Sequence, residues 1–217
     1  MDKPNIPYGY VCIEGNIGAG KTSFCKKLAL QCNVSLILEQ FNDNPFLPLF
    51  YETPERYAFT VELFFMTERY KQLQGSLQSI GMFHDFYLAD YTFIKTLLFA
   101  RKNLEEEEFK LFTMLYNILE KNFPTPDLLV YFHRDVDILM GNINARGREI
   151  EKSIKSEYLI QVQNSYFEYF RNILTYPVLI IDLKEMDFLN DENNYNVIID
   201  LISKKYNPGV HRISLNV

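Results

Sequence analysis

One glycine-rich segment constrains this chain more than any other feature. Residues 15–22 spell Gly-Asn-Ile-Gly-Ala-Gly-Lys-Thr, which matches the pattern G-x-x-x-x-G-K-[ST]. An apolar run precedes the segment and a helical pattern follows it, so the segment connects a buried strand to a helix. In such a loop, glycines let backbone N–H groups approach an anion, and the helix directs its positive end at the same point. A glycine-rich turn without function is the alternative, but the strand-loop-helix context favours an α/β protein that binds phosphate.

The rest of the chain alternates short apolar runs with longer helical patterns. This alternation predicts parallel βαβ units, a doubly wound sheet and one domain over residues 1–217. In such sheets the ligand lies beyond the carboxyl ends of the strands. The predicted strands are Tyr8–Ile13, Val34–Leu38, Phe86–Ala89, Leu128–Phe132 and Val178–Ile181, and the predicted helices are Lys21–Leu30, Pro54–Ser79, Tyr91–Lys121 (broken near Asn103), Val136–Ala145, Ser156–Leu174 and Asn193–Tyr206.

The composition argues against some classes of binding partner and of cellular location. The formal net charge is −6, whereas a nucleic-acid binder usually carries a surplus of cations that neutralise phosphates. No apolar run approaches the roughly 20 residues of a membrane span, and the N-terminus shows no signal-peptide pattern. The three cysteines lack metal-ligand spacing, so we expect free thiols in a cytoplasmic protein.

The phosphate loop predicts how a nucleoside triphosphate such as ATP is held. The Lys21 ammonium neutralises the β- and γ-phosphates, and the Thr22 hydroxyl ligates Mg²⁺. The pattern alone does not distinguish an ATPase, a GTPase and a kinase, although the guanine-binding N-K-x-D motif is absent from the sequence. The predicted nucleotide-binding residues are Gly15, Asn16, Ile17, Gly18, Ala19, Gly20, Lys21 and Thr22.

Acidic residues follow two of the predicted strands. Glu39 ends the second strand, where a carboxylate can accept the proton of an attacking hydroxyl; a surface acid at the start of a loop is the alternative. Asp90 ends the third strand, where it is expected to help hold Mg²⁺ and to border the substrate. Asp is also a preferred helix N-cap, and the two roles are compatible.

Two further groups suggest a site for the acceptor. Arg146 and Arg148 flank Gly147, which suits a mobile lid that binds developing phosphate charge; a solvated cation pair at a helix end is the alternative. Glu62 and Arg69 are two turns apart on one predicted helix face, where they could contact the edge of a base. A partly solvated, salt-linked helix face is the alternative.

These motifs together resemble the deoxynucleoside kinases, and most closely the bacterial deoxyguanosine and deoxyadenosine kinases. The resemblance runs from Val11 to about Ile202. The phosphate loop is shared with many families, whereas the later motifs are more specific. Those motifs are Asn44-Pro45-Phe46-Leu47 with Phe50-Tyr51, Glu62-Leu63-Phe64-Phe65 with Glu68-Arg69-Tyr70, and Arg146-Gly147-Arg148.

The resemblance implies a P-loop kinase fold with a five-stranded parallel sheet, helices on both faces and a homodimer. It implies that Glu39 is the general base and that Tyr51 and Glu151 hold the sugar 3′-hydroxyl. Glu62 and Arg69 fall where the family contacts the base. Arg146 and Arg148 match lid arginines, in a lid segment around residues 142–155, and Asp187 and Phe188 match the loop that covers the donor's base.

Three positions depart from the pattern that most relatives share. Tyr91 stands where most relatives carry an arginine that steadies the general base, although the deoxyguanosine kinase branch also has tyrosine. Asn142 stands where relatives carry another lid arginine, and Glu62 stands where many have glutamine. The resemblance therefore leaves the source of two positive charges open.

We expect an enzyme of nucleotide salvage that transfers phosphate from ATP·Mg²⁺ to a purine 2′-deoxyribonucleoside. An ionised Glu62 carboxylate accepts hydrogen bonds, and guanine offers two adjacent donors, so deoxyguanosine ranks before deoxyadenosine. Burial of Glu62 would weaken this preference, because a protonated acid both donates and accepts. A nucleoside monophosphate kinase or another small-acceptor P-loop kinase is the first alternative, and a non-catalytic nucleotide-binding module is the second.

Overall fold

The computed structural model describes residues 3–40, 44–77, 83–173 and 175–215. Within them the chain forms a six-stranded, entirely parallel sheet in the order β2-β3-β1-β4-β5-β6. The strands are β1 (Tyr10–Gly15), β2 (Val34–Ile37), β3 (Phe86–Ala89), β4 (Leu128–His133), β5 (Pro177–Asp182) and β6 (Gly209–Ser214).

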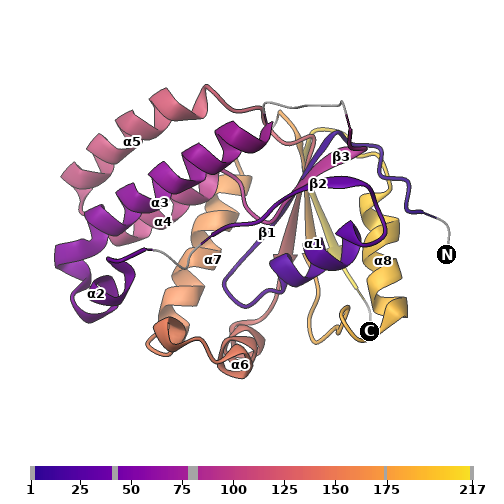
Figure 1. Ribbon diagram of the computed structural model, residues 1–217. Coiled ribbons are helices and arrows are strands. Elements are labelled where there is room, and N and C mark those ends of the chain that lie inside the picture. The colour runs from indigo at the N-terminus through magenta and orange to yellow at the C-terminus, as the bar shows by residue number, and fades with distance from the viewer. Residues whose placement is uncertain (1–2, 41–43, 78–82, 174, 216–217) are drawn as a thin grey trace.

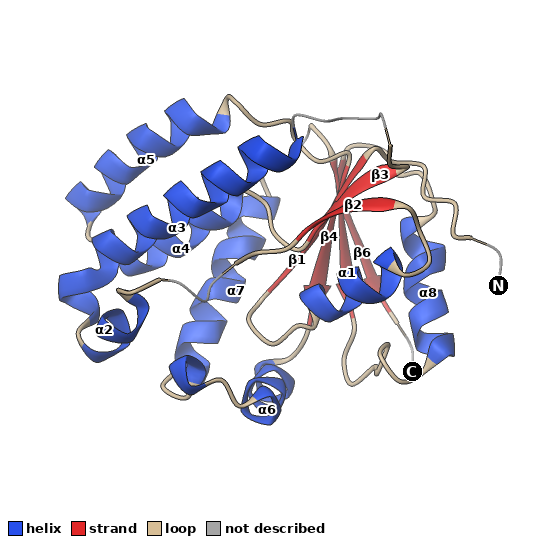
Figure 2. Cartoon of the chain, viewed as in Figure 1, coloured by secondary structure: helices blue, strands red, loops and turns tan. Residues whose placement is uncertain are grey.

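Helices cover both faces of this sheet (Figures 1 and 2). The helices are α1 (Lys21–Ala29), α2 (Leu47–Glu52), α3 (Pro54–Leu77), α4 (Ile94–Asn103), α5 (Glu106–Glu120), α6 (Val136–Arg146), α7 (Ser156–Phe170) and α8 (Glu192–Ile202), with a 3₁₀ turn at Glu149–Glu151. Alternate residues of each strand face opposite layers, so Val11 and Ile13 pack with α1, α6 and α8, while Tyr10 and Cys12 pack with α3, α4, α5 and α7. The predicted doubly wound α/β fold is therefore confirmed.

The sixth strand differs from the expected five-stranded sheet. In β6 the less exposed positions are Gly209, His211 and Ile213, so Ile213 is the one large apolar side chain on that face. Polar contacts hold the strand instead, because Arg212 and Ser214 both donate to the Asp182 carboxylate of β5. An apolar run is absent from such a strand, which explains why the hydrophobic pattern did not reveal it.

The long helical pattern predicted over Tyr91–Lys121 is divided into two helices. The first begins only at Ile94, because Thr92 donates from its backbone and its hydroxyl to the buried carboxylate of Glu14. The second begins after Glu105, which forms a capping box with Glu108. The predicted ends of two other helices, Ser79 and Leu174, lie outside the described residues.

The three cysteines are free thiols, as predicted. Cys12, Cys25 and Cys32 are also all buried. Among the described helices, none is both long and apolar enough to cross a membrane.

The phosphate loop packs directly on α6 through a glycine. Gly18 has a φ of +84°, and a Cβ atom there would lie 2.8 Å from the carbonyl oxygen of Leu139. Gly141, on the same helix, has no atom within 4 Å of such a Cβ. The close approach of loop and helix therefore depends on the missing side chain of Gly18.

We expect Gly18→Ala to lower the free energy of unfolding by about 1–3 kcal/mol, because it adds both backbone strain and a clash. Gly141→Ala is the matched control and should raise that free energy by about 0.5–1 kcal/mol through helix propensity. Urea denaturation of both variants measures the difference. Equal effects of the two substitutions would contradict the proposed contact.

Candidate active site

The phosphate loop lies between the end of β1 and the start of α1, as the sequence predicted. Gly20 precedes the helix with a φ of +90° and no side chain caps the first turn, so the N–H groups of that turn remain available to an anion. The Lys21 ammonium donates to the Asn16 carbonyl oxygen at 2.9 Å, across the loop. Burial, with the nearby Lys95 charge, lowers the pKa of Lys21 to about 8.

Asn16 has a structural contact in this loop as well as its predicted place beside the nucleotide. Its side-chain amide donates to the Leu159 carbonyl of α7 at 2.8 Å and its oxygen accepts from the Ile17 N–H at 2.9 Å. The side chain therefore anchors the loop to α7 and leaves the backbone to face the phosphates.

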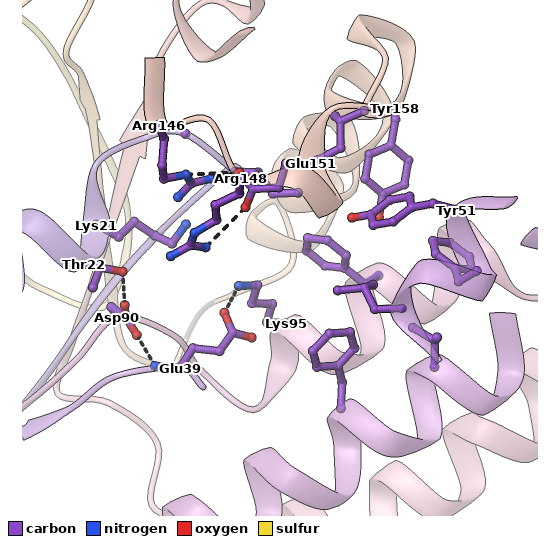
Figure 3. Close-up of a pocket in the computed structure, with 18 of the residues that line it drawn as sticks. Lys21, Thr22, Glu39, Tyr51, Asp90, Lys95, Arg146, Arg148, Glu151 and Tyr158 are labelled. Atoms are coloured by element: carbon purple, nitrogen blue, oxygen red, sulfur yellow. Dashed lines mark hydrogen bonds and ion pairs between the residues drawn. The ribbon is translucent and has the colours of Figure 1, made fainter. Parts of the chain in front are cut away.

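Asp90 joins the phosphate loop to the end of β2. One carboxylate oxygen accepts from the Thr22 hydroxyl, and the other accepts from the Glu39 N–H at 2.7 Å (Figure 3). Phe93 precedes α4, so Asp90 does not cap that helix. The predicted metal pair, Thr22 and Asp90, is thus brought into direct contact.

Glu39 is buried, which excludes the surface-acid alternative for this residue. Arg69 of α3 donates to Oε1 through Nε at 2.8 Å and Nη2 at 2.6 Å, and Lys95 of α4 donates to Oε2. Burial alone raises the pKa of Glu39, but Lys95 and Arg69 outweigh it and lower that pKa to about 2. The carboxylate is therefore ionised throughout the physiological range.

Arg69 lies nearer to the reacting end of the pocket than the sequence interpretation placed it. Its third nitrogen, Nη1, donates to the Thr96 hydroxyl at 3.0 Å, so the guanidinium is held between α3 and α4. Glu62 and Arg69 are both buried, which rules out a solvated helix face. Among the residues the structure describes, no ion pair joins these two side chains.

Glu62 instead contacts a residue that the sequence did not single out. Asn103, at the end of α4, donates to Glu62 Oε1 at 2.6 Å, while Oε2 is buried without a hydrogen-bond partner. Burial raises the pKa of Glu62 to about 7, although Asn103 and the Arg69 charge oppose the shift. Glu62 therefore titrates near neutral pH and offers one unoccupied oxygen.

Glu62 shares one pocket with the phosphate loop, and Tyr51, Glu151 and Tyr158 line the same pocket. Lys21 and Thr22 occupy one end in Figure 3, and Tyr51 and Tyr158 the other. Burial, with the Glu151 and Glu62 charges, raises the pKa of Tyr51 to about 12, so its hydroxyl stays protonated. The predicted substrate residues thus face one cavity beside the phosphate loop.

The lid arginines are both paired with one carboxylate. Glu151 accepts from Arg146 Nη2 at 2.6 Å and from Arg148 Nη1 at 3.3 Å, and Gly147 between the arginines has a φ of +66° (Figure 3). The two arginines line the pocket at the end of α6, and their side chains are 37% and 38% exposed. Their guanidinium groups and the Glu151 carboxylate form one charged cluster over the cavity.

A second depression beside the loop contains the residues that the sequence predicted near the donor's base. Asp187 and Phe188 line it together with Asn142, whose amide donates to the Gly18 carbonyl at 2.9 Å. The Phe188 ring itself is buried against Phe24 and Phe132. Phe188 therefore supports the loop from the core, and Asn142 contacts the loop where an arginine was expected.

Sequence reasoning missed Lys95, Asn103 and Tyr158. Lys95 did carry a signal, since it interrupts the apolar sequence Phe93-Ile94…Leu97-Leu98 of a predicted helix. Tyr91, in contrast, turns away from the pocket and donates to Gln72 at 2.8 Å. The positive charge beside Glu39 comes from α4 and α3 instead of the end of β3.

Comparison with known proteins agrees with this arrangement. Residues 11–206 match the family model "Deoxynucleoside kinase". The chain belongs to the deoxynucleoside kinase family. The chain is 30% identical to a deoxyguanosine kinase of Bacillus subtilis, over 87% of this chain and 93% of the relative, and 29% identical to a deoxyadenosine/deoxycytidine kinase of the same organism, over 94% and 96%.

A solved structure supports the fold independently. The kinase superposes on a deoxyadenosine kinase from M. mycoides with bound dATP, with a TM-score of 0.76, 21% identity, and coverage of 90% of this chain and 100% of that chain. Members of this family are phosphotransferases, which excludes the non-catalytic module considered from the sequence.

We expect Lys21→Ala to lower kcat of the kinase by about 10²-fold or more while leaving the fold intact, because it removes the positive charge predicted to face the transferring phosphate. Lys26→Ala, on the exposed side of the same helix, is the control and should retain activity. A coupled ADP-release assay and circular dichroism measure both properties. Near-normal turnover in Lys21→Ala would contradict the predicted phosphate-binding role of this loop.

Proposed function

We propose that the kinase transfers the γ-phosphoryl group of ATP to the 5′-hydroxyl of a purine 2′-deoxyribonucleoside, preferring deoxyguanosine to deoxyadenosine, and serves nucleotide salvage. The observation that carries the proposal is one pocket that contains the phosphate loop, Glu39 and Glu62, with Glu62 two helical turns along α3 from Arg69, which binds Glu39. A nucleoside fits this order, since its 5′-hydroxyl and its base are at opposite ends.

Glu39 is the proposed general base. It lies in the same cavity as Lys21, and its ionised carboxylate can accept the proton of the attacking hydroxyl. A pKa of about 2 makes it a weak base, but phosphoryl transfer has a loose transition state and depends mainly on positioning and charge neutralisation. Holding the hydroxyl in line with the phosphorus is then the larger part of its role.

The donor and metal parts of the proposal rest on the loop and on Asp90. Mg²⁺ bound with phosphates needs one or two protein oxygens, the remaining ligands being phosphates and water. Thr22 and Asp90, already in contact, supply such a hydroxyl and carboxylate, so these residues fit the ion. When bound, it would neutralise developing phosphate charge.

The lid segment, residues 142–155, supplies the remaining groups. Arg146 and Arg148 are proposed to bind the transferring phosphate, and Glu151 with Tyr51 to bind the 3′-hydroxyl of the sugar. All four side chains line the pocket that holds Glu39. The single domain and the homodimer expected from the resemblance belong to the same proposal, and sedimentation of the purified protein tests the dimer.

A nucleoside monophosphate kinase is the alternative that shares this chemistry. Its acceptor carries a phosphate, which requires cations in the acceptor end of the pocket. That end contains Tyr51, Glu62, Asn103 and Tyr158, and both lid arginines contact Glu151. An acidic, hydroxyl-rich end favours an uncharged nucleoside.

We expect Glu39→Gln to lower kcat by about 10²-fold or more, with a smaller loss of nucleoside affinity, because the substitution removes the proton acceptor and keeps the shape. Single-turnover kinetics with a panel of deoxynucleosides measures kcat separately from binding. Glu68→Gln, an exposed change on α3, is the control. A kcat within a few-fold of the original would place the base elsewhere.

Base preference should depend on pH, because the pKa of Glu62 is raised to about 7. Below pH 7 the protonated acid can both donate to and accept from adenine, whereas above pH 7 the carboxylate accepts both guanine donors. We expect the ratio of kcat/KM for deoxyguanosine to that for deoxyadenosine to rise about 10-fold or more between pH 6 and pH 8.

In Glu62→Gln this rise should disappear and the ratio should move toward deoxyadenosine, whereas Glu55→Gln, an exposed change on the same helix, should leave the ratio unchanged. A protein that prefers deoxyadenosine at every pH, with a ratio that Glu62→Gln does not alter, would show that Glu62 does not select the base.

A further inference from the structure

Lys95 is a buried cation directed at the reacting end of the pocket. It lies on α4, its side chain is 6% exposed, and its ammonium donates to Oε2 of Glu39. The ammonium also lies 5.6 Å from the centre of the Phe99 ring, and Lys95 lines the cavity with Lys21 and Thr22. Burying a lysine is unfavourable unless its ammonium is paired with an opposite charge, because burial disfavours the charged form.

The two cations on Glu39 are held differently. All three guanidinium nitrogens of Arg69 have fixed partners, since Nε and Nη2 bind Glu39 and Nη1 binds Thr96. Lys95 reaches the other oxygen through a flexible stem that ends in three rotatable donors. Arg69 therefore holds Oε1 of Glu39 against the α3–α4 pair, and Lys95 binds the other oxygen, Oε2.

We propose that Lys95 is a positioning residue for phosphoryl transfer: its ammonium orients Oε2 of Glu39 beside the phosphate loop. The inference rests on the role of Glu39 proposed above. Figure 3 shows the ammonium of Lys95 and the carboxylate of Glu39 facing each other below the lid arginines. Without this contact, only Arg69 would offset the unfavourable free energy of burying the Glu39 carboxylate.

Three side chains fix the position of Glu39. Arg69 binds it from α3 and Lys95 from α4, while Asp90 accepts its backbone N–H at the end of β3. When the Lys95 contact to Oε2 is lost, the contact from Arg69 to Oε1 is the one of these that still orients the carboxylate. The carboxylate is then less well directed at an attacking hydroxyl, and the chemical step slows.

The test compares Lys95→Met and Lys95→Arg with the unchanged protein, and uses Lys102→Met as the matched control, because Lys102 is exposed on the same helix. The measurement is kcat at pH 7 and KM for ATP and for whichever deoxynucleoside the protein phosphorylates fastest. We expect Lys95→Met to lower kcat about 10-fold or more, because Glu39 is then poorly oriented toward the attacking hydroxyl.

Lys95→Arg should restore most of kcat, and the KM for ATP should change little. Glu39→Gln combined with Lys95→Met should lose little beyond Glu39→Gln alone, since a residue that acts through Glu39 has nothing left to position. Thermal unfolding of each variant shows whether it is folded. If Lys95→Met is not, Lys95→Gln takes its place, because it removes the charge and keeps a polar side chain with an N–H donor.

A kcat of a folded Lys95→Met variant within a few-fold of the unchanged protein, or losses that add to those of Glu39→Gln, would overturn the proposal and leave Lys95 a packing role. Failure of the proposed function has a different signature, because then the unchanged protein phosphorylates no purine deoxynucleoside. In that case the same comparison with whichever acceptor the protein does phosphorylate still tests the contact, and additive losses of kcat would overturn it.

Discussion

The buried carboxylate of Glu39 is the point on which the site depends, because four elements meet there. Its backbone N–H is bound by Asp90 after β3, and its oxygens are bound by Arg69 from α3 and Lys95 from α4. Isolated buried charges are strongly unfavourable, whereas paired ones with satisfied hydrogen bonds are tolerated. Removal of one partner would leave an uncompensated charge, so the cluster fixes the two helices and the two strand ends relative to one another.

A second carboxylate in the same pocket has its pKa shifted in the opposite direction. Glu39, between two cations, has a pKa near 2, whereas Glu62, with an amide on one oxygen and no partner on the other, has a pKa near 7. Their environments thus separate two chemically similar groups, one proposed for the reacting hydroxyl and one proposed for the base. Both side chains line one cavity, so local charge distinguishes them within it.

The parts of this arrangement that the sequence revealed are those encoded locally. The phosphate loop is a contiguous motif, and the strands around Val11, Leu88 and Val130 are uninterrupted apolar runs, so both could be predicted with nearly the observed boundaries. The hydrogen-bond partners of the site residues could not be predicted, because they depend on how the helices pack. Arg69 lies seven residues after Glu62, yet it binds Glu39.

Other misses have the same origin. Asn103 meets Glu62 across 41 residues of sequence, and no periodicity indicates such a contact. The short helix α2 was not predicted, since Leu47–Glu52 is too short for a helical period to be visible. The edge strand β6 shows that a strand held by ion pairs and hydrogen bonds escapes a search for apolar runs.

The contact between Gly18 and α6 has a mechanical consequence for the charged cluster above the pocket. Leu139 packs on Gly18 and the Asn142 amide donates to the Gly18 carbonyl, so α6 is anchored to the phosphate loop. The first residue after these contacts with a left-handed backbone is Gly147. Arg146 lies on the α6 side of Gly147 and Arg148 on the side of Glu151, yet the Glu151 carboxylate binds both arginines. A rotation at Gly147 would therefore separate Arg146 from Glu151, whereas Arg148 would move with Glu151.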